Sequence, residues 1–230
     1  MKYRPLQEEC WEVNLQLPKL GLVDLTFGNV SVADPEARVF AIKPSGVDYG
    51  SLRPADIVVM DYDGNTVEGT MRPSSDTPTH RRLLQAFTGM RAVVHTHSRN
   101  AVAFAQAETP IPCLGTTHSD YFRGSVPVTR RLTPDEIAGE YEWETGNVIV
   151  ERFQEIAPEE VPAVLVAGHG PFTWGPSGTK AVETAQALEI IASMAWKTLQ
   201  IRPETPPLST GLTDKHFLRK HGSSAYYGQT

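Results

Sequence analysis

Three histidines of the chain stand at the ends of apolar stretches, where metal ligands are often found. His95 and His97 follow the apolar residues 92–94. Side chains two apart in a strand point to one face, so both imidazoles would converge on one point just beyond a sheet. His169 ends a second apolar stretch with a glycine on either side, which allows backbone and ligand to approach closely. Asp76 precedes a predicted helix and could add a carboxylate.

Neutral imidazoles with one oxygen ligand suit Zn²⁺, and Mn²⁺, Co²⁺ or Fe²⁺ are lesser candidates. On spacing alone, the alternative is that histidines at strand ends are only hydrogen-bonded within the fold. The remaining histidines are weaker candidates for metal ligands: His80, His118, His216 and His221.

Two further segments have the composition of a phosphate site. KPSG (43–46) combines a cation, a hydroxyl and a flexible backbone after a predicted strand. PSSDTPTH (73–80) places Ser74 and Ser75 just before a helix, where free backbone N–H groups and the helix dipole favour an anion. The alternative is an ordinary turn for the first segment and a helix cap for the second.

The elements that must position these residues can be read from the apolar pattern. Helices are predicted, on spacing and caps, at 6–20, 79–87, 100–107, 133–153 and 177–201. Strands are predicted at 27–32, 38–43, 56–61, 92–97 and 172–175, and residues 162–170 are predicted as a buried strand that runs into a turn. Residues 203–213 are expected to form a loop before a polar tail. This order predicts a sheet with helices on both faces, and no linker-like stretch divides the chain into two domains.

Composition limits the classes of function. The chain has 230 residues, 40% hydrophobic and 21% charged, with a formal net charge of -6. An acidic protein has no general attraction for nucleic acid or anionic membrane, so any phosphate site must be local. No run of about 18 apolar residues predicts a membrane span, and residues 1–14 lack the apolar stretch of a signal peptide. Cys10 and Cys113 are expected to be reduced packing residues, which indicates a cytoplasmic protein.

Eight segments of the sequence match one enzyme family, in the same order along the chain. They are LTFGNVS, IKPSGVDY, EGT…PSSDTPTH, VVHTHS, GTTHSDYF, GEYEWETGNVIVE, GHGPFTWG and DKHFLRKHG…AYYGQ. On these segments the chain resembles the L-ribulose-5-phosphate 4-epimerases, a family within the class II aldolases. The resemblance runs from about residue 8 to the C-terminus.

The resemblance implies a fold, an assembly and a metal. The fold would be a single α/β domain over residues 1–230, with three layers in which a central, mostly antiparallel sheet is flanked by helices. The assembly would be a homotetramer with active sites between neighbouring subunits. The metal would be Zn²⁺, with Mn²⁺ or Co²⁺ as substitutes, and its ligands would be Asp76, His95, His97 and His169.

The resemblance also implies roles in binding and catalysis. Gly28 and Asn29 would contact the sugar, and Asp120 and Tyr227 would be the acid–base pair, with Tyr227 reaching a neighbour's site. Ala167 is a departure, because relatives often carry a histidine two residues before the third metal ligand. That histidine is not itself a ligand, so the metal assignment is unaffected. The residues expected at the phosphate are Ser45, Gly46, Ser74, Ser75 and, nearby, Lys43.

The reaction expected of this family explains why such residues are needed. In L-ribulose 5-phosphate the carbonyl at carbon 2 does not acidify the hydrogen on carbon 4, so proton abstraction cannot invert that centre. Cleavage between carbons 3 and 4 gives a dihydroxyacetone enediolate and glycolaldehyde phosphate. Addition to the other face of the aldehyde then gives D-xylulose 5-phosphate. A divalent metal would supply Lewis-acid stabilisation, and Asp120 and Tyr227 would handle the proton of the carbon 4 oxygen.

Other interpretations of single residues stay open. Asp120 could cap a turn, and Tyr227, in a polar tail, could be a surface residue. Glu142 is expected to be a solvated charge on a helix rather than a catalytic group. His216 and Arg219 of the tail could approach the site together with Tyr227.

Alternative functions also remain. A class II sugar-phosphate aldolase would share the metal and phosphate sites but release its aldehyde product. The aspartate at position 76, where those aldolases use a glutamate, and the segment around Asp120 favour the epimerase. A non-enzymatic module like the aldolase-like head of adducin would need no metal ligands. An enzyme for another phosphosugar, or a dehydratase on the same fold, is a third possibility.

Overall fold

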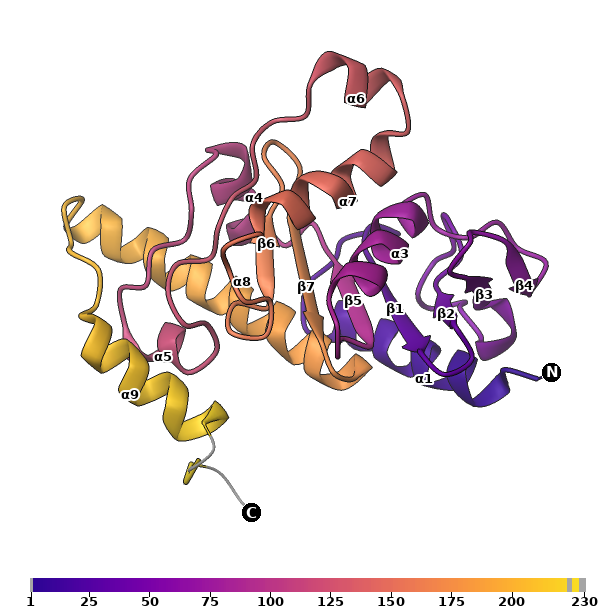
Figure 1. Ribbon diagram of the computed structural model, residues 1–230, viewed down its shortest axis with the longest axis horizontal. Coiled ribbons are helices and arrows are strands. Elements are labelled where there is room, and N and C mark those ends of the chain that lie inside the picture. Colours follow the sequence, from indigo (N-terminus) through magenta and orange to yellow (C-terminus); the bar gives the residue numbers. More distant parts are fainter. Residues whose placement is uncertain (1, 223–224, 228–230) are drawn as a thin grey trace.

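A seven-stranded sheet, in which neighbouring strands are all antiparallel, runs through the molecule in the computed structural model (Figure 1). The structure describes residues 2–222 and 225–227. The strand order is β4-β3-β2-β1-β5-β7-β6. The strands are β1 Asn29–Asp34, β2 Val39–Ile42, β3 Val58–Asp61, β4 Thr66–Glu68, β5 Ala92–His95, β6 Ala163–Leu165 and β7 Pro171–Gly175.

Side-chain alternation along the strands builds one core on each face of the sheet. In β1, Val30 and Val32 join the core that also holds Val13 of α1. In β2, Phe40 and Ile42 join the core on the other face. These strands are apolar on both sides because both faces are covered by helices.

The helices form an outer layer on either side of the sheet. Helix α1 and the first half of α8 pack on one face, α3 and α7 cover the other, and α4 contacts α8. Within the described residues, no helix is both long and apolar enough to cross a membrane. The predicted fold class, an α/β domain with a mostly antiparallel sheet between helical layers, is therefore confirmed. The helices are α1 Arg4–Asn14, α2 Gln16–Lys19, α3 Thr77–Ala86, α4 Arg99–Gln106, α5 Thr116–Ser119, α6 Pro134–Ala138, α7 Tyr141–Arg152, α8 Gly178–Ile201 and α9 Thr210–His221, with a 3₁₀ turn η1 at Pro54–Asp56.

The predicted helix 133–153 is wrong in one respect, because the chain forms two helices there. Thr133 caps α6 as predicted, accepting from the Glu136 N–H, and the Glu136 carboxylate accepts from the Thr133 N–H. At Gly139 the backbone leaves the helical region, with φ -88° and ψ -131°, and α7 starts at Tyr141. Because of this break, Tyr141 and the residues after it form the N-terminus of a separate helix.

The region after α8 was predicted as a loop and a polar tail. Residues 203–209 form a loop as predicted, but Thr210–His221 form helix α9 instead. Only Thr213 and Phe217 of this helix are buried, so its apolar pattern is too weak to read from sequence. Polar contacts with the rest of the molecule hold it. Asp214 pairs with Arg123 at 2.8 Å, and Arg219 donates to the Asp120 carboxylate.

Candidate metal and anion site

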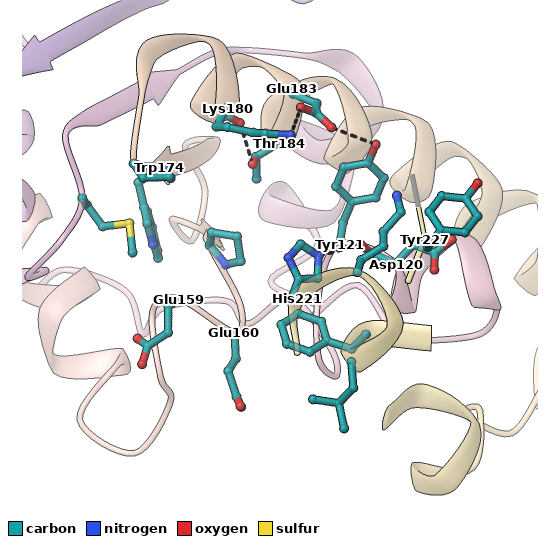
Figure 2. Close-up of a pocket in the computed structure, with 17 residues that line it drawn as sticks. Asp120, Tyr121, Glu159, Glu160, Trp174, Lys180, Glu183, Thr184, His221 and Tyr227 are labelled. Atoms are coloured by element: carbon teal, nitrogen blue, oxygen red, sulfur yellow. Dashed lines mark hydrogen bonds and ion pairs between the residues drawn. The ribbon is translucent and has the colours of Figure 1, made fainter. Parts of the chain in front are cut away.

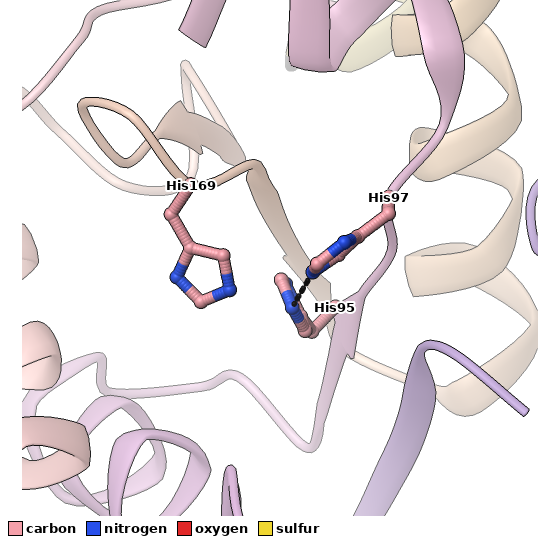
Figure 3. A group of neighbouring side chains, drawn as sticks. All are labelled: His95, His97 and His169. Atoms are coloured by element: carbon pink, nitrogen blue, oxygen red, sulfur yellow. Dashed lines mark hydrogen bonds between the residues drawn. The ribbon is translucent and has the colours of Figure 1, made fainter. Parts of the chain in front are cut away.

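The three histidines singled out by the sequence come together at one end of the central strands. His95 is the last residue of β5, opposite Asn29 of β1 and Phe172 of β7. His97 lies two residues beyond it, and His169 lies in the turn that joins β6 to β7. One ring nitrogen of each histidine lies within 4.8 Å of the other two, and the three side chains point toward a common space with their rings edge to face (Figure 3).

Hydrogen bonding determines which nitrogen of His95 faces the cluster. Its Nδ1 lies 3.0 Å from the Pro171 carbonyl oxygen, which can only accept, so Nδ1 carries the proton. In a neutral ring this leaves Nε2 as a lone pair, 3.1 Å from Nε2 of His97. Two ring nitrogens this close need a proton or a cation between them, because two facing lone pairs would repel each other. Three imidazoles arranged in this way fit a divalent cation such as Zn²⁺ or Mn²⁺.

The surroundings keep two of these imidazoles neutral. Burial, together with the neighbouring His95 and His97, lowers the pKa of His169 to about 4. Burial and His95 also lower the pKa of His97, against the opposing effect of Asp76. A metal binds the unprotonated ring, so these lowered pKa values leave the ligands ready near neutral pH.

Asp76 places a carboxylate at the same site. It caps α3, and its Oδ2 accepts hydrogen bonds from Asn29 Nδ2 at 2.7 Å and Ser74 Oγ at 3.4 Å. Burial alone would raise the pKa of Asp76, but the nearby His95 and His80 and the Asn29 amide outweigh it, so the net shift is downward. An ionised carboxylate therefore stands beside the imidazole cluster.

Two loops next to this cluster form one wall. The Ser45 N–H donates to the Arg72 carbonyl at 3.0 Å, and the Ser74 N–H donates to the Lys43 carbonyl at 3.1 Å. These two bonds join the KPSG loop to the loop before α3, so the two segments with phosphate-site composition form one surface. The N-terminus of α3 adds its dipole there.

One cavity of about 430 Å³ contains both groups of residues. Every metal-ligand and substrate-binding residue predicted from the sequence lines it. The metal-ligand candidates are Asp76, His95, His97 and His169, and the substrate-binding candidates are Gly28, Asn29, Lys43, Ser45, Gly46, Ser74 and Ser75.

Gly28 is required by the geometry of the cavity wall. Its φ is +78°, and a Cβ there would lie 2.7 Å from Val23 Cγ1 and 2.9 Å from the His95 carbonyl oxygen. Gly21 also has a left-handed φ, +68°, but a Cβ there would meet nothing within 4 Å. The two glycines therefore differ in steric crowding rather than in backbone conformation.

Gly28→Ala is accordingly expected to destabilise the protein more than Gly21→Ala. The left-handed backbone costs an alanine about 1–2 kcal/mol at either position, and the clash at Gly28 adds about 1–3 kcal/mol. Urea unfolding of both variants measures the difference. Equal unfolding free energies of the two variants would show that the neighbours of Gly28 move aside without any loss of stability.

The predicted acid–base pair lies elsewhere in the chain. Asp120 caps the C-terminal end of α5, and Tyr227 follows α9. Arg219 Nη2 donates to both Asp120 carboxylate oxygens at 2.9 and 3.0 Å, and His216 Nδ1 lies 3.2 Å from Oδ1. The Tyr227 ring stacks over the Arg219 guanidinium at 4.4 Å.

Asp120 and Tyr227 line a second cavity of about 790 Å³ (Figure 2). This cavity is bordered by Tyr121, Trp174 and Lys180 and by none of the described metal-ligand candidates. Within one chain, the structure thus brings Asp120 and Tyr227 to each other but not to the histidine cluster. Their catalytic role stays a prediction.

Five residues that line the first cavity were not predicted as site residues, and Thr26 and Pro44 are two of them. Tyr141 and Glu142, at the start of α7, line it, although Glu142 was expected to be only a solvated charge. The helix break at Gly139 is the signal that would have placed both at a helix N-terminus. Phe27 also lines the cavity, with its ring stacked on His97 at 5.8 Å between centroids.

Comparison with known proteins identifies the family. The model of the class II aldolase and adducin N-terminal domain matches residues 8–196. The chain belongs to the class II aldolase family. A curated relative, the L-ribulose-5-phosphate 4-epimerase UlaF of Salmonella paratyphi B, is 49% identical over 97% of this chain and 98% of its own length.

Solved structures of class II aldolases share the fold. An L-fuculose 1-phosphate aldolase aligns with a TM-score of 0.78 at 25% identity, covering 92% of this chain and 94% of the other. An L-fuculose-1-phosphate aldolase from Thermus thermophilus aligns with a TM-score of 0.69 at 28% identity, covering 88% of this chain and 98% of the other.

Proposed function

We propose that the protein is an L-ribulose-5-phosphate 4-epimerase, which interconverts L-ribulose 5-phosphate and D-xylulose 5-phosphate. The observation that carries the proposal is the single cavity in which a three-histidine cluster adjoins two loops suited to a phosphate. The 49% identity to the Salmonella epimerase over nearly the whole chain supports the same substrate.

The cavity suits an aldol cleavage of this substrate. A divalent metal held by Asp76, His95, His97 and His169 would supply Lewis-acid stabilisation of the negative charge that develops when the bond between carbons 3 and 4 breaks. Asp76 is oriented for this by the Asn29 amide, and His95 by the Pro171 carbonyl. These fixed contacts preorganise the ligands before any substrate binds.

The phosphate loops have a specific task in an epimerase. Glycolaldehyde phosphate must stay bound while its carbonyl turns to present the other face. Ser45, Ser74 and Ser75 line the wall where the backbone of the two loops and the start of α3 favour an anion. Lys43 brings a cation to the same wall. Held at this end, the aldehyde can rotate without leaving.

We further infer that the active site is shared between subunits of a homotetramer. Asp120 and Tyr227 would reach the histidine cavity of a neighbouring copy, one on each side of the carbon 4 oxygen, and exchange its proton. Support comes from their separation from the histidines within one chain and from their clustering with Arg219 at the surface of α9.

We also propose a domain organisation, a metal and a cellular location for the enzyme. We regard residues 1–230 as one domain, because one sheet and its helices include every strand of the described residues. Zinc is the proposed metal, with manganese or cobalt as substitutes, since the donors are mainly imidazoles. A cytoplasmic location in carbohydrate breakdown, such as that of L-arabinose, is consistent with Cys10 and Cys113 being buried free thiols.

The test is incubation of the purified, metal-loaded protein with L-ribulose 5-phosphate. An epimerase is expected to give D-xylulose 5-phosphate with only traces of glycolaldehyde phosphate, because re-addition outpaces release. Product analysis by NMR or a coupled transketolase assay distinguishes these compounds. Accumulation of free dihydroxyacetone and glycolaldehyde phosphate would identify an aldolase instead, and the absence of either reaction would refute the proposal.

A further inference from the structure

Tyr49 lies behind the wall of the histidine cavity and contacts two separate parts of it. The side chain is only 5% exposed. Its hydroxyl lies 3.0 Å from the Phe27 carbonyl oxygen and 2.8 Å from the Gly28 carbonyl oxygen, so one phenolic proton serves both acceptors. The face of its ring lies 4.7 Å from the ammonium of Lys43.

The ring contact matters because Lys43 is a buried cation. Lys43 is 2% exposed, and its Nζ lies 3.5 Å from the Pro44 carbonyl oxygen, the long limit for a hydrogen bond. Burial lowers the pKa of Lys43, and Asp48 only partly opposes this. An aromatic face attracts a desolvated ammonium, so the Tyr49 ring helps to keep Lys43 charged and directed at the cavity.

The hydroxyl contact matters because the turn at Phe27 and Gly28 supports the metal ligands. The Phe27 ring stacks on His97 with an interplanar angle of 24°. Gly28 packs so closely on the His95 backbone that no side chain fits. A hydroxyl that binds both carbonyls therefore fixes the turn against two of the histidines.

We propose that Tyr49 is a positioning residue with two separable actions: its ring holds Lys43 for the substrate phosphate, and its hydroxyl holds the turn at Phe27 and Gly28 beside the metal ligands. The inference rests on the proposed function and deepens it. It predicts that removing the hydroxyl changes turnover, whereas removing the ring also changes phosphate affinity.

Phosphate affinity tests the action of the ring. Inorganic phosphate is titrated calorimetrically into zinc-loaded protein freed of excess zinc. Tyr49→Phe, which keeps the ring, is expected to bind within about twofold of the unmodified protein, and Tyr49→Leu about tenfold more weakly. Tyr62→Leu is the matched control, because Tyr62 lies under the Arg38 guanidinium at 5.5 Å and does not line the cavity. Its phosphate affinity is expected to be unchanged.

Steady-state kinetics test the action of the hydroxyl. Tyr49→Phe is expected to lower kcat for L-ribulose 5-phosphate about tenfold while KM stays within about twofold. Tyr49→Leu is expected to lower kcat similarly and also to raise KM. A residue that only stabilised the fold would also lower the apparent kcat at unchanged KM, because fewer molecules would be active. The rate is therefore expressed per phosphate-binding site counted in the titration, and a purely structural loss would leave kcat per site unchanged.

Two results would overturn the proposal. One is equal phosphate affinity of Tyr49→Phe and Tyr49→Leu. The other is a Tyr49→Leu protein with fewer binding sites but the original affinity per site, which would show a loss of folded protein alone. If the unmodified protein fails to epimerise the sugar, the proposed function is refuted, while the phosphate titrations still decide whether Tyr49 positions Lys43.

Discussion

Chelation of the divalent metal is expected to lower turnover of L-ribulose 5-phosphate by at least about 10³-fold, and added Zn²⁺ or Mn²⁺ is expected to restore it. The physical reason is the negative charge that develops on the ketose fragment as the carbon–carbon bond breaks. Among the described residues that line the histidine cavity, Lys43 is the only lysine or arginine, and we place Lys43 at the phosphate. The measurement is activity against metal content determined by atomic absorption.

The fold should survive this treatment, which makes the activity loss interpretable. The histidines sit on a sheet whose two cores are apolar and independent of the metal. Circular dichroism of the metal-free protein is therefore expected to match that of the loaded protein. His97→Asn should behave like chelated protein that cannot be reloaded. Full turnover in metal-free protein would contradict the mechanism.

Asp120→Asn is expected to bind the substrate with nearly unchanged affinity and to lower kcat by about 10²–10⁴-fold, the usual contribution of one acid–base group. Asparagine can still accept a hydrogen bond from Arg219, so the contact between α5 and α9 is kept. Asp214→Asn is the control, because it removes another carboxylate that pairs with an arginine, Arg123, and is expected to keep kcat within about threefold.

Mixing inactive variants tests whether Asp120 acts on a neighbour's cavity. Asp120→Asn keeps an intact histidine cluster, and His97→Asn keeps an intact Asp120. If sites are shared between subunits, random co-assembly makes about a quarter of them complete, and activity returns to about that fraction. If each chain holds a complete site of its own, the mixture has only the summed activity of the two inactive variants.

The strands near the histidine cluster could be predicted because their pattern is local. The apolar run before His-Thr-His specifies a strand, although the predicted strand 92–97 ends at His95. His97 lies beyond the strand, and its Nε2 is still 3.1 Å from Nε2 of His95. His169 could be predicted for a similar reason, because residues 162–170 read as a buried strand that runs into a turn. The strand is Ala163–Leu165, and Val166 N–H then closes the turn onto the Gly170 carbonyl at 2.9 Å.

The parts that could not be predicted depend on contacts between distant segments. Helix α9 has only two buried residues, and polar contacts such as Arg123–Asp214 and Arg219–Asp120 hold it. Tyr49 belongs to the IKPSGVDY segment, but its contacts with Phe27 and Lys43 exist only once the loops have packed together. Tyr141 and Glu142 depend on the break at Gly139, which an otherwise helical pattern conceals.

The antiparallel sheet holds the histidine cluster on its central strands, whereas Asp120 and Tyr227 are carried by a short helix and a C-terminal segment beyond the β6 edge (Figure 1). In the proposed mechanism, the groups that deliver and remove protons can therefore vary in evolution without rebuilding the electrophilic centre. A chimera can exchange only residues 116–124 and the region after α8 with those of a fuculose-phosphate aldolase. Its products would show whether these peripheral segments determine if the aldehyde is retained or released.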